Sequence, residues 1–345
     1  MKGNEAVAEA AVRAGCRYYF GYPITPQTEL MEYLAWRLPE VGGTFLQAES
    51  ELAAINMVYG ASGAGARVMT SSSGPGISLK QEGISFLASA ELPCVIVDVM
   101  RGGPGLGTIQ PSQGDYFQAT RGGGHGDYKL PVLSPSSVQE MADLAYKAFD
   151  LAERYRTPVL MLTDGVLGQM MEPIELPPAK EELPTRSWIT NGCMGRNRRL
   201  IKTLYLEAAE LEAHNLHLQE KFDQINKSEA SVDTYRLEDA EGLIVAFGIC
   251  GRVARSAVDN LRAAGLRIGL LRPVTLWPFP AAALSEAAGK VKRLLVVELN
   301  CGQMVQDIRM VFPGRRVHFY GRMGGVVISA KEIEAEVQRI FKEKA

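Results

Sequence analysis

Residues 70–105 read TSSSGPGISLKQEGISFLASAELPCVIVDVMRGGPG, and this stretch contains the pattern that decides the fold. It starts at the end of a strand that we expect over 67–70, passes through a helix over 75–89 and ends in an apolar strand over 94–99. Short apolar strands that alternate with helices are typical of a parallel sheet covered on both faces. The segment therefore predicts one step of an α/β fold.

The same alternation continues on both sides of this segment. The pattern predicts strands over 18–20, 44–46 and 158–162, and it predicts helices over 4–13, 26–38, from Ser50 onward and over 136–154. Pro26 suits the first turn of its helix, and Ser50 suits an N-cap. We therefore expect a doubly wound domain over residues 1–170.

Residues 171–240 differ from both flanks. EPIELPPAKEELP (172–184) is rich in proline and acidic residues, which indicates a linker on the surface. Over 201–229 we expect a long amphipathic helix, because a four–three spacing joins Leu204, Ala208, Leu211, Asn215, Leu218, Phe222 and Ile225. That helix either packs on its own chain or forms a subunit contact.

A second doubly wound α/β unit is expected over residues 241–345. Its predicted strands cover 243–247, 268–271 and 294–298, and its predicted helices cover 252–264, 303–311 and 330–344.

Composition argues against several classes of function. The 345 residues include 37 Lys and Arg against 39 Asp and Glu, so no basic surplus exists for nucleic acid. We see no signal peptide and no apolar run long enough to span a membrane, so we expect a cytoplasmic protein. The five cysteines lie far apart without a CxxC pair, and the histidines lack metal-site spacing, which predicts no metal or iron–sulfur site in this chain.

Three polar residues follow predicted strands and are candidates for a ligand site. They are Thr25 in GYPITP (21–26), Glu51 in QAESE (47–51) and Arg101 in VMRGGPG (99–105). In open α/β sheets, ligands bind beyond the carboxyl ends of the strands. Each residue also has a simpler explanation. Thr25 would cap a helix, and Glu51 would be a carboxylate that the dipole at a helix N-terminus stabilises. Arg101 would bind no anion.

The glycine-rich stretch 101–130 predicts a long loop without a stable helix, which is usually functional or mobile. Within it, GGGHGD (122–127) does not follow a strand, so a dinucleotide-binding fingerprint is not supported. The chain has no Walker A loop and no GxSxG elbow.

Taken together, the motifs resemble the α subunit of the 2-oxoacid:ferredoxin oxidoreductases. The resemblance lies in YPITPQTE (22–29), QAESELAAINMVYGAS (47–62), the 70–105 segment and TPVLMLTDG (157–165). LLRPVTLWPFP (270–280) and VVELNCGQM (296–304) resemble that subunit's second domain, which is similar to a transketolase C-terminal domain. Within the family the chain looks most like the branched-chain type that acts on 3-methyl-2-oxobutanoate, with the 2-oxoglutarate type as near neighbour.

The resemblance implies thiamine diphosphate shared between two chains. Residues 1–170 would form the pyrimidine-binding domain, and a β subunit would hold the diphosphate, Mg²⁺ and a [4Fe-4S] cluster. Additional γ and ferredoxin-like δ subunits are left open. The implied reaction converts a 2-oxoacid and coenzyme A to acyl-CoA and CO₂, with electrons passing to ferredoxin.

The resemblance also implies roles for individual residues. Glu51 matches the glutamate that hydrogen-bonds the aminopyrimidine ring and favours its imino tautomer. Pro23 and Ile24 would lie against the cofactor, and Thr25 and Arg101 match residues that orient the substrate carboxylate. Glu49 stays outside this assignment.

Two other functions compete with this one. A split transketolase-like or deoxyxylulose-phosphate-synthase-like subunit would share the domain order, but it needs cations for sugar phosphates. A regulatory or assembly subunit would keep the fold without catalysis, although the presence of Thr25, Glu51 and Arg101 together argues against it.

Overall fold

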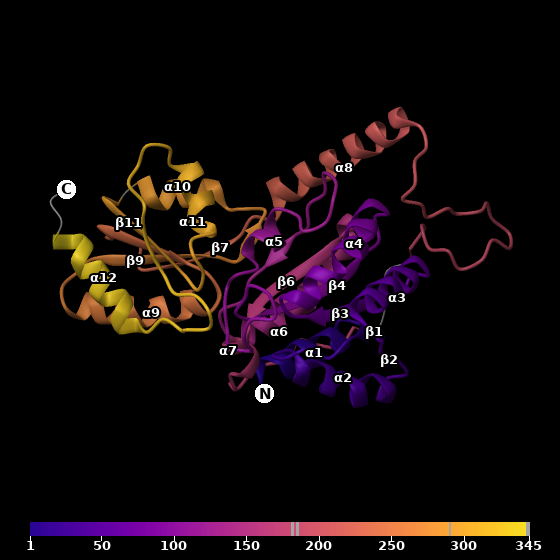
Figure 1. The fold of residues 1–345 in the computed structure, drawn as a ribbon, viewed down its shortest axis with the longest axis horizontal. Helices are drawn as coiled ribbons and strands as arrows, with labels where there is room; N and C mark the ends of the chain where they lie inside the picture. The colour runs from indigo at the N-terminus through magenta and orange to yellow at the C-terminus, as the bar shows by residue number, and fades with distance from the viewer. Residues whose placement is uncertain (181–182, 184–185, 290, 343–345) are drawn as a thin grey trace.

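The computed structural model describes residues 1–180, 183, 186–289 and 291–342, and these residues form two sheets with helices on both faces (Figure 1). The first sheet has seven strands in the order β10-β5-β6-β4-β3-β1-β2. Only β10 runs antiparallel to its neighbour in this sheet. The strands are β1 (Tyr18–Gly21), β2 (Thr44–Gln47), β3 (Val68–Ser72), β4 (Cys94–Met100), β5 (Val132–Leu133), β6 (Pro158–Asp164) and β10 (Thr275–Trp277).

Helices cover the first sheet because apolar residues line both of its faces. One face carries α1 (Gly3–Arg13), α2 (Thr28–Glu40), α6 (Val138–Tyr155) and α7 (Gly165–Gln169). The other carries α3 (Glu51–Gly63), α4 (Pro75–Ser89), α5 (Tyr116–Thr120) and α8 (Ala208–Ser228). The strands at its centre, β3, β4 and β6, are buried along their whole length, as expected for a doubly wound sheet.

The second sheet has the order β12-β11-β8-β9-β7, and β7 is its antiparallel edge strand. Its strands are β7 (Val232–Tyr235), β8 (Gly242–Ala246), β9 (Ile268–Pro273), β11 (Arg293–Glu298) and β12 (His318–Gly321). The helices on its faces are α9 (Gly248–Ala263) and α12 (Ala330–Lys342) on one side and α10 (Ala281–Gly289) and α11 (Met304–Val311) on the other. This arrangement confirms the expected fold class of two doubly wound units.

Several details differ from the sequence prediction. Strands β5, β7, β10 and β12 and helices α7 and α10 are not among the predicted elements, and α9 begins at Gly248 where the prediction began at residue 252. The second helix begins at Thr28, not at Pro26, because residues 24–27 form a turn that closes with a bond from the Gln27 amide to the Ile24 carbonyl (3.1 Å). The helix expected over 201–229 begins at Ala208, so Leu204 lies outside it. The 101–130 loop carries one short helix, α5. Parts of the predicted linker (181–182 and 184–185) and of the last helix (343–344) lie outside the described residues.

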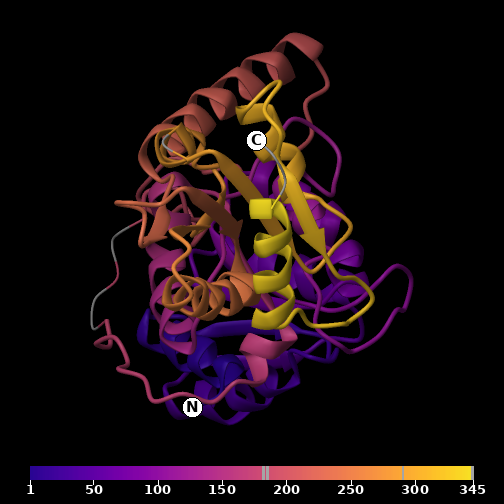
Figure 2. The same cartoon turned by 90° about the vertical axis from the view of Figure 1, so that its left-hand side faces the viewer.

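The helix α8 packs on its own chain through its C-terminal half. Leu218, Phe222 and Ile225 are buried, and the Phe222 ring meets Trp277 edge-on at 5.9 Å. Leu216, in the N-terminal half, is exposed. Figure 2 shows this helix along the top of the molecule, with α12 against the second sheet. In the part of the chain that the structure describes, no helix is both long and apolar enough to cross a lipid bilayer.

Two strands do not follow the predicted boundary at residue 241. β7 precedes residue 241 but belongs to the second sheet, whereas β10 follows it and extends the first. The boundaries 1–170, 171–240 and 241–345 remain a prediction.

Candidate functional site

The carboxyl edge of the first sheet contains a topological switch point between β1 and β3. The chain leaves β1 toward α2 on one face of the sheet and leaves β3 toward α4 on the other face. Such a divergence opens a crevice where ligands bind in doubly wound folds. Thr25 follows β1, Glu51 follows β2 and Arg101 follows β4, so all three predicted site residues lie at this edge.

The loop after β1 is held by a buried glutamine. Gln27 donates from its side-chain amide to the Tyr22 carbonyl oxygen (3.3 Å) and accepts a hydrogen bond from the Ser71 hydroxyl (2.6 Å). Asn4, in α1, donates to the Pro26 carbonyl oxygen (2.8 Å). The loop therefore has a fixed shape, set by the sheet and by α1.

This anchoring leaves the predicted residues of the loop accessible. Pro23 and Thr25 are exposed, and Ile24 is half-buried. Thr25 does not cap α2, because the N-cap position is Gln27. The simple explanation of Thr25 as a helix cap is therefore wrong.

Glu51 begins α3 at a tightly packed point. Ser50 is the N-cap, as predicted, and its hydroxyl accepts from the Ala53 amide (3.1 Å). Glu51 is only 5% exposed, whereas the neighbouring Glu49 is exposed. A Cβ atom at Gly76 would lie 2.6 Å from a Glu51 carboxylate oxygen, so only glycine lets α4 approach this carboxylate so closely.

Arg101 joins the loop after β1 to the loop after β4. Its guanidinium donates from Nη1 to the Thr25 carbonyl oxygen (3.1 Å) and from Nη2 to the Leu106 carbonyl oxygen (3.1 Å). The side chain is buried, and its Nε has no hydrogen-bond partner among the described residues. A guanidinium has five N–H donors, so Arg101 keeps donors for an anion.

The structure adds a carboxyl pair that the sequence prediction missed. Burial, and then the neighbouring Asp115, raise the pKa of Asp98 well above its usual value. Burial raises the pKa of Asp115 to about 6, against the charge of Arg101 and a hydrogen bond from the Gly74 backbone. Two such groups side by side share one proton. The signal was an aspartate inside the otherwise apolar strand CVIVDVM.

Several buried polar atoms at this edge have no hydrogen-bond partner among the described residues. They are the hydroxyls of Ser72 and Ser73 and Nε of Arg101. Most buried polar atoms in native proteins are paired, so this concentration indicates that a ligand completes the site. The mixture of carboxylate, hydroxyl and guanidinium groups fits a polar heterocycle beside an acid, which is the donor set that an aminopyrimidine and a 2-oxoacid need.

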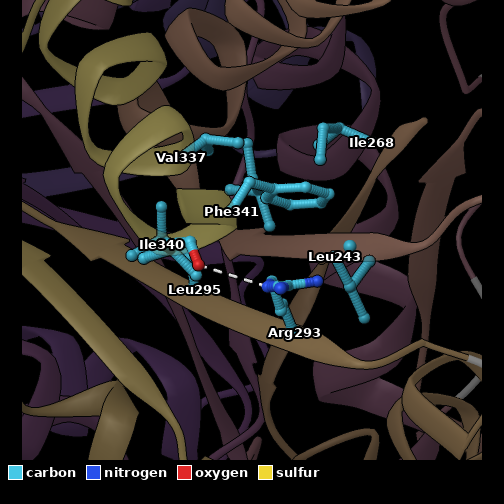
Figure 3. Close-up of a pocket in the computed structure, with 9 residues that line it drawn as sticks. Leu243, Ile268, Arg293, Leu295, Val337, Ile340 and Phe341 are labelled. Atoms are coloured by element: carbon cyan, nitrogen blue, oxygen red, sulfur yellow. Dashed lines mark hydrogen bonds between the residues drawn. The ribbon is translucent and has the colours of Figure 1, made fainter. Parts of the chain in front are cut away.

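The second unit has an apolar pocket that is separate from the candidate site (Figure 3). It is formed under α12, where the Arg293 guanidinium donates to the Ile340 carbonyl oxygen (3.2 Å) and stacks over the Phe341 ring (4.7 Å). Gly242, Ile268 and Arg293, which line it, are the first residues of their strands. The pocket thus opens at the amino ends of the strands, away from the ligand-binding edge.

Comparison with known proteins identifies both units. Residues 9–223 match the family of pyruvate flavodoxin/ferredoxin oxidoreductase thiamine-diphosphate-binding domains, and residues 240–333 match the pyruvate:ferredoxin oxidoreductase core domain II. The ketoisovalerate oxidoreductase subunit VorB of Methanothermobacter thermautotrophicus is 54% identical over 99% of this chain and 97% of its own length. The 2-oxoglutarate synthase subunit KorA of Methanocaldococcus jannaschii is 38% identical over 98% of both chains.

Solved structures agree with this assignment. A 2-oxoglutarate:ferredoxin oxidoreductase from Magnetococcus marinus, with 2-oxoglutarate, coenzyme A and succinyl-CoA bound, superposes with a TM-score of 0.88 at 28% identity, over 98% of this chain and 64% of that one. A split-gene transketolase (TM-score 0.62, 15% identity, 98% of this chain and 97% of that one) shares the fold alone. The resemblance found in the motifs is confirmed. The chain belongs to the thiamine-diphosphate-binding pyruvate flavodoxin/ferredoxin oxidoreductase family, whose members are subunits of 2-oxoacid oxidoreductases.

Proposed function

We propose that this chain is the α subunit of a ferredoxin oxidoreductase that oxidatively decarboxylates 3-methyl-2-oxobutanoate. The observation that carries the choice of substrate is the 54% identity to a ketoisovalerate oxidoreductase subunit, against 38% and 39% to 2-oxoglutarate synthase subunits. Coenzyme A accepts the acyl group, CO₂ leaves, and two electrons pass to ferredoxin. Thiamine diphosphate, when bound, supplies the nucleophilic carbon and accepts the electrons that decarboxylation leaves behind.

The residues of this chain bind and orient in the proposal. The Glu51 carboxylate accepts a hydrogen bond from the protonated pyrimidine ring nitrogen, which its buried position at the start of α3 supports. Pro23 and Ile24 form part of the wall beside that ring. Thr25 and the spare donor of Arg101 receive the carboxylate of the 2-oxoacid, since the bond between Arg101 and the Thr25 backbone joins these two residues.

The proposal places the rest of the site on a partner. A β subunit would bind the diphosphate through Mg²⁺ and carry a [4Fe-4S] cluster, and γ and δ subunits would complete a larger assembly. The unpaired cysteines support a reducing, cytoplasmic location. The subunit names of the relatives support a multi-subunit enzyme.

The alternative substrate is 2-oxoglutarate, which the similarity to KorA and to the Magnetococcus marinus enzyme favours. Its distal carboxylate needs a second cation in the pocket, whereas 3-methyl-2-oxobutanoate needs an apolar wall.

The test is an assay of the assembled complex with a viologen dye as electron acceptor. The complex is supplied with coenzyme A and, in turn, with 3-methyl-2-oxobutanoate, 2-oxoglutarate and pyruvate. We expect the highest kcat/KM for 3-methyl-2-oxobutanoate. A higher kcat/KM for 2-oxoglutarate would support the alternative, and no dye reduction with any of the three acids would refute both.

A further inference from the structure

Lys80 is a fully buried lysine in α4 that the proposed function leaves without a role. None of its surface is exposed, and its ammonium donates a hydrogen bond to the Thr70 hydroxyl (3.1 Å). An ammonium group has three donors, and burying its charge without compensation is costly. A negative group close by is therefore required.

The topology shows where that negative charge lies. Thr70 and Ser72 are two residues apart in β3, so their side chains project from the same face of the strand. Gly76 and Lys80 are one turn apart on α4, so they share a face of that helix. A Cβ atom at Gly76 would lie 2.1 Å from the Ser72 hydroxyl and 2.6 Å from the Glu51 carboxylate. Glu51 and Lys80 thus face the same narrow space between α3, α4 and β3.

The ionisation of Lys80 agrees with this geometry. Burial lowers the pKa of Lys80 to about 8, and the negative charge of Glu51 opposes that fall. Of the other groups packed around it, Thr70 and Ser72 do not titrate. Asp98 and Asp115 are not among the groups whose charge acts on Lys80. Glu51 is the charged group that acts on Lys80.

We propose that Lys80 is a positioning residue for Glu51: the Lys80 ammonium offsets the charge of the buried Glu51 carboxylate and keeps that carboxylate directed at the crevice. This inference rests on the proposed function, in which Glu51 shares a proton with the pyrimidine ring. A buried carboxylate without a counter-charge takes up a proton of its own. A carboxyl group protonated in that way is a poor acceptor for the protonated ring nitrogen, so Lys80 maintains the state of Glu51 that the reaction needs.

The first test measures the electrostatic coupling between Lys80 and Glu51 without any activity assay. In the full-length chain at pH 7, thermal or urea unfolding of Lys80→Met, Glu51→Gln and the double variant forms a double-mutant cycle. We expect a coupling of about tenfold in the unfolding equilibrium constant, because each single variant leaves one buried group uncompensated. Additive effects would overturn the proposal.

A second readout needs no Lys80 variant and so remains available if Lys80→Met does not fold. Between about pH 8 and the usual pKa of 10.5, the unfolded chain binds the proton that folded Lys80 has lost, so stability rises with pH in this window. In Glu51→Gln the rise should begin at a lower pH, because the opposing charge is gone. A rise that begins at the same pH in both proteins would contradict the pairing.

The third test connects the pair to catalysis in the assembled enzyme. Lys80→Met should lower kcat and move the acid limb of the pH–rate profile up by about one unit, with the KM for the 2-oxoacid nearly unchanged. Thr70→Val, which removes the partner of the ammonium, should cause a smaller shift in the same direction. Lys147→Met, at an exposed position of α6, serves as the control.

These measurements separate the inference from the proposed function. Lower turnover with an unshifted pH profile would mean that Lys80 only supports the fold. If the assembled complex reduced no dye with any 2-oxoacid, the proposed function would fail, and the unfolding cycle would still decide whether Lys80 and Glu51 are paired.

Discussion

Acidic side chains are buried at the carboxyl edges of both sheets, but their hydrogen bonding differs between the two edges. In the second sheet, Glu298 at the end of β11 accepts hydrogen bonds from the amides of Met304 (2.8 Å) and Val305 (3.0 Å) and from the side chain of Asn300 (2.9 Å). In the first sheet, Asp98 lies beside a second acidic group, Asp115, and among the described residues the Gly74 backbone supplies the one hydrogen bond that favours its charged form. A satisfied buried acid indicates a structural role, and an incompletely satisfied one indicates a binding site.

The largest expected effect separates Glu51 from the residues that only support the fold. Glu51→Gln in the assembled enzyme should lower turnover by about 10²- to 10⁴-fold, the range for loss of a proton-transferring group. Steady-state dye reduction measures this. The control is Glu49→Gln, two residues away and exposed, which should keep turnover close to that of the unchanged protein. Near-normal turnover of Glu51→Gln would remove Glu51 from the proposed site.

Arg101 tests whether the unpaired donors at the first edge bind substrate. Arg101→Met should raise the KM for the 2-oxoacid about 10- to 100-fold, because a charge-assisted hydrogen bond worth about 1.5–3 kcal/mol is lost. Arg101→Lys should recover part of this loss, since it keeps the charge but not the fork of donors. Arg198→Met, at an exposed position, is the control. An unchanged KM in Arg101→Met would contradict the substrate role.

A substitution of Glu298 tests whether a fully hydrogen-bonded buried acid has only a structural role. Glu298→Ala should lower the free energy of unfolding by about 2–4 kcal/mol, because three buried donors lose their acceptor. The KM of the folded variant should stay the same, since Glu298 lies on the other sheet. Urea unfolding and steady-state kinetics check the two halves. A raised KM with unchanged stability would show that the two edges do not differ as described.

The smallest expected effect concerns the Asp98–Asp115 pair. Both pKa values are raised in the folded protein, so between about pH 4 and pH 6 the folded state binds more protons than the unfolded state. The stability of the unchanged protein should therefore fall as the pH rises through this window and above it. Asp98→Asn should remove most of this fall and stabilise the protein by about 1 kcal/mol at pH 7.

Melting temperatures across pH 4 to 8 measure this difference. Asp223→Asn, at an exposed position of α8, should leave the slope unchanged. An unchanged slope in Asp98→Asn would show that the two carboxyl groups do not share a proton.

The sequence predicted most of the fold because apolar strands and helix caps are local signals. Ser50 shows this well, since its hydroxyl caps α3 as expected. The start of α2 was wrong by two residues, because the bonds of Gln27 to the loop depend on β3 and cannot be seen in local sequence.

The candidate site was predictable only where a residue follows a strand. Thr25, Glu51 and Arg101 do, and the topology brings them to one edge. Lys80 was missed because it looks like any helical lysine. It is buried because glycines let α3 and α4 approach closely, as at Gly83, where a Cβ atom would lie 2.5 Å from the Ile55 side chain. Such a contact depends on packing between helices, which local periodicity does not reveal.

Strand β10 follows the linker in the sequence but completes the first sheet, so the two α/β units are not structurally independent. Thr275 pairs with Leu133 and the Ser134 amide bonds to the Val274 carbonyl oxygen (2.8 Å), so the outer strand of the first sheet is encoded far downstream of its other strands. A gene cut in the linker would produce an upstream fragment whose sheet has the two-residue strand β5 as its edge, without the strand that pairs with Leu133. Recombination at this boundary would therefore have to keep the two α/β units together.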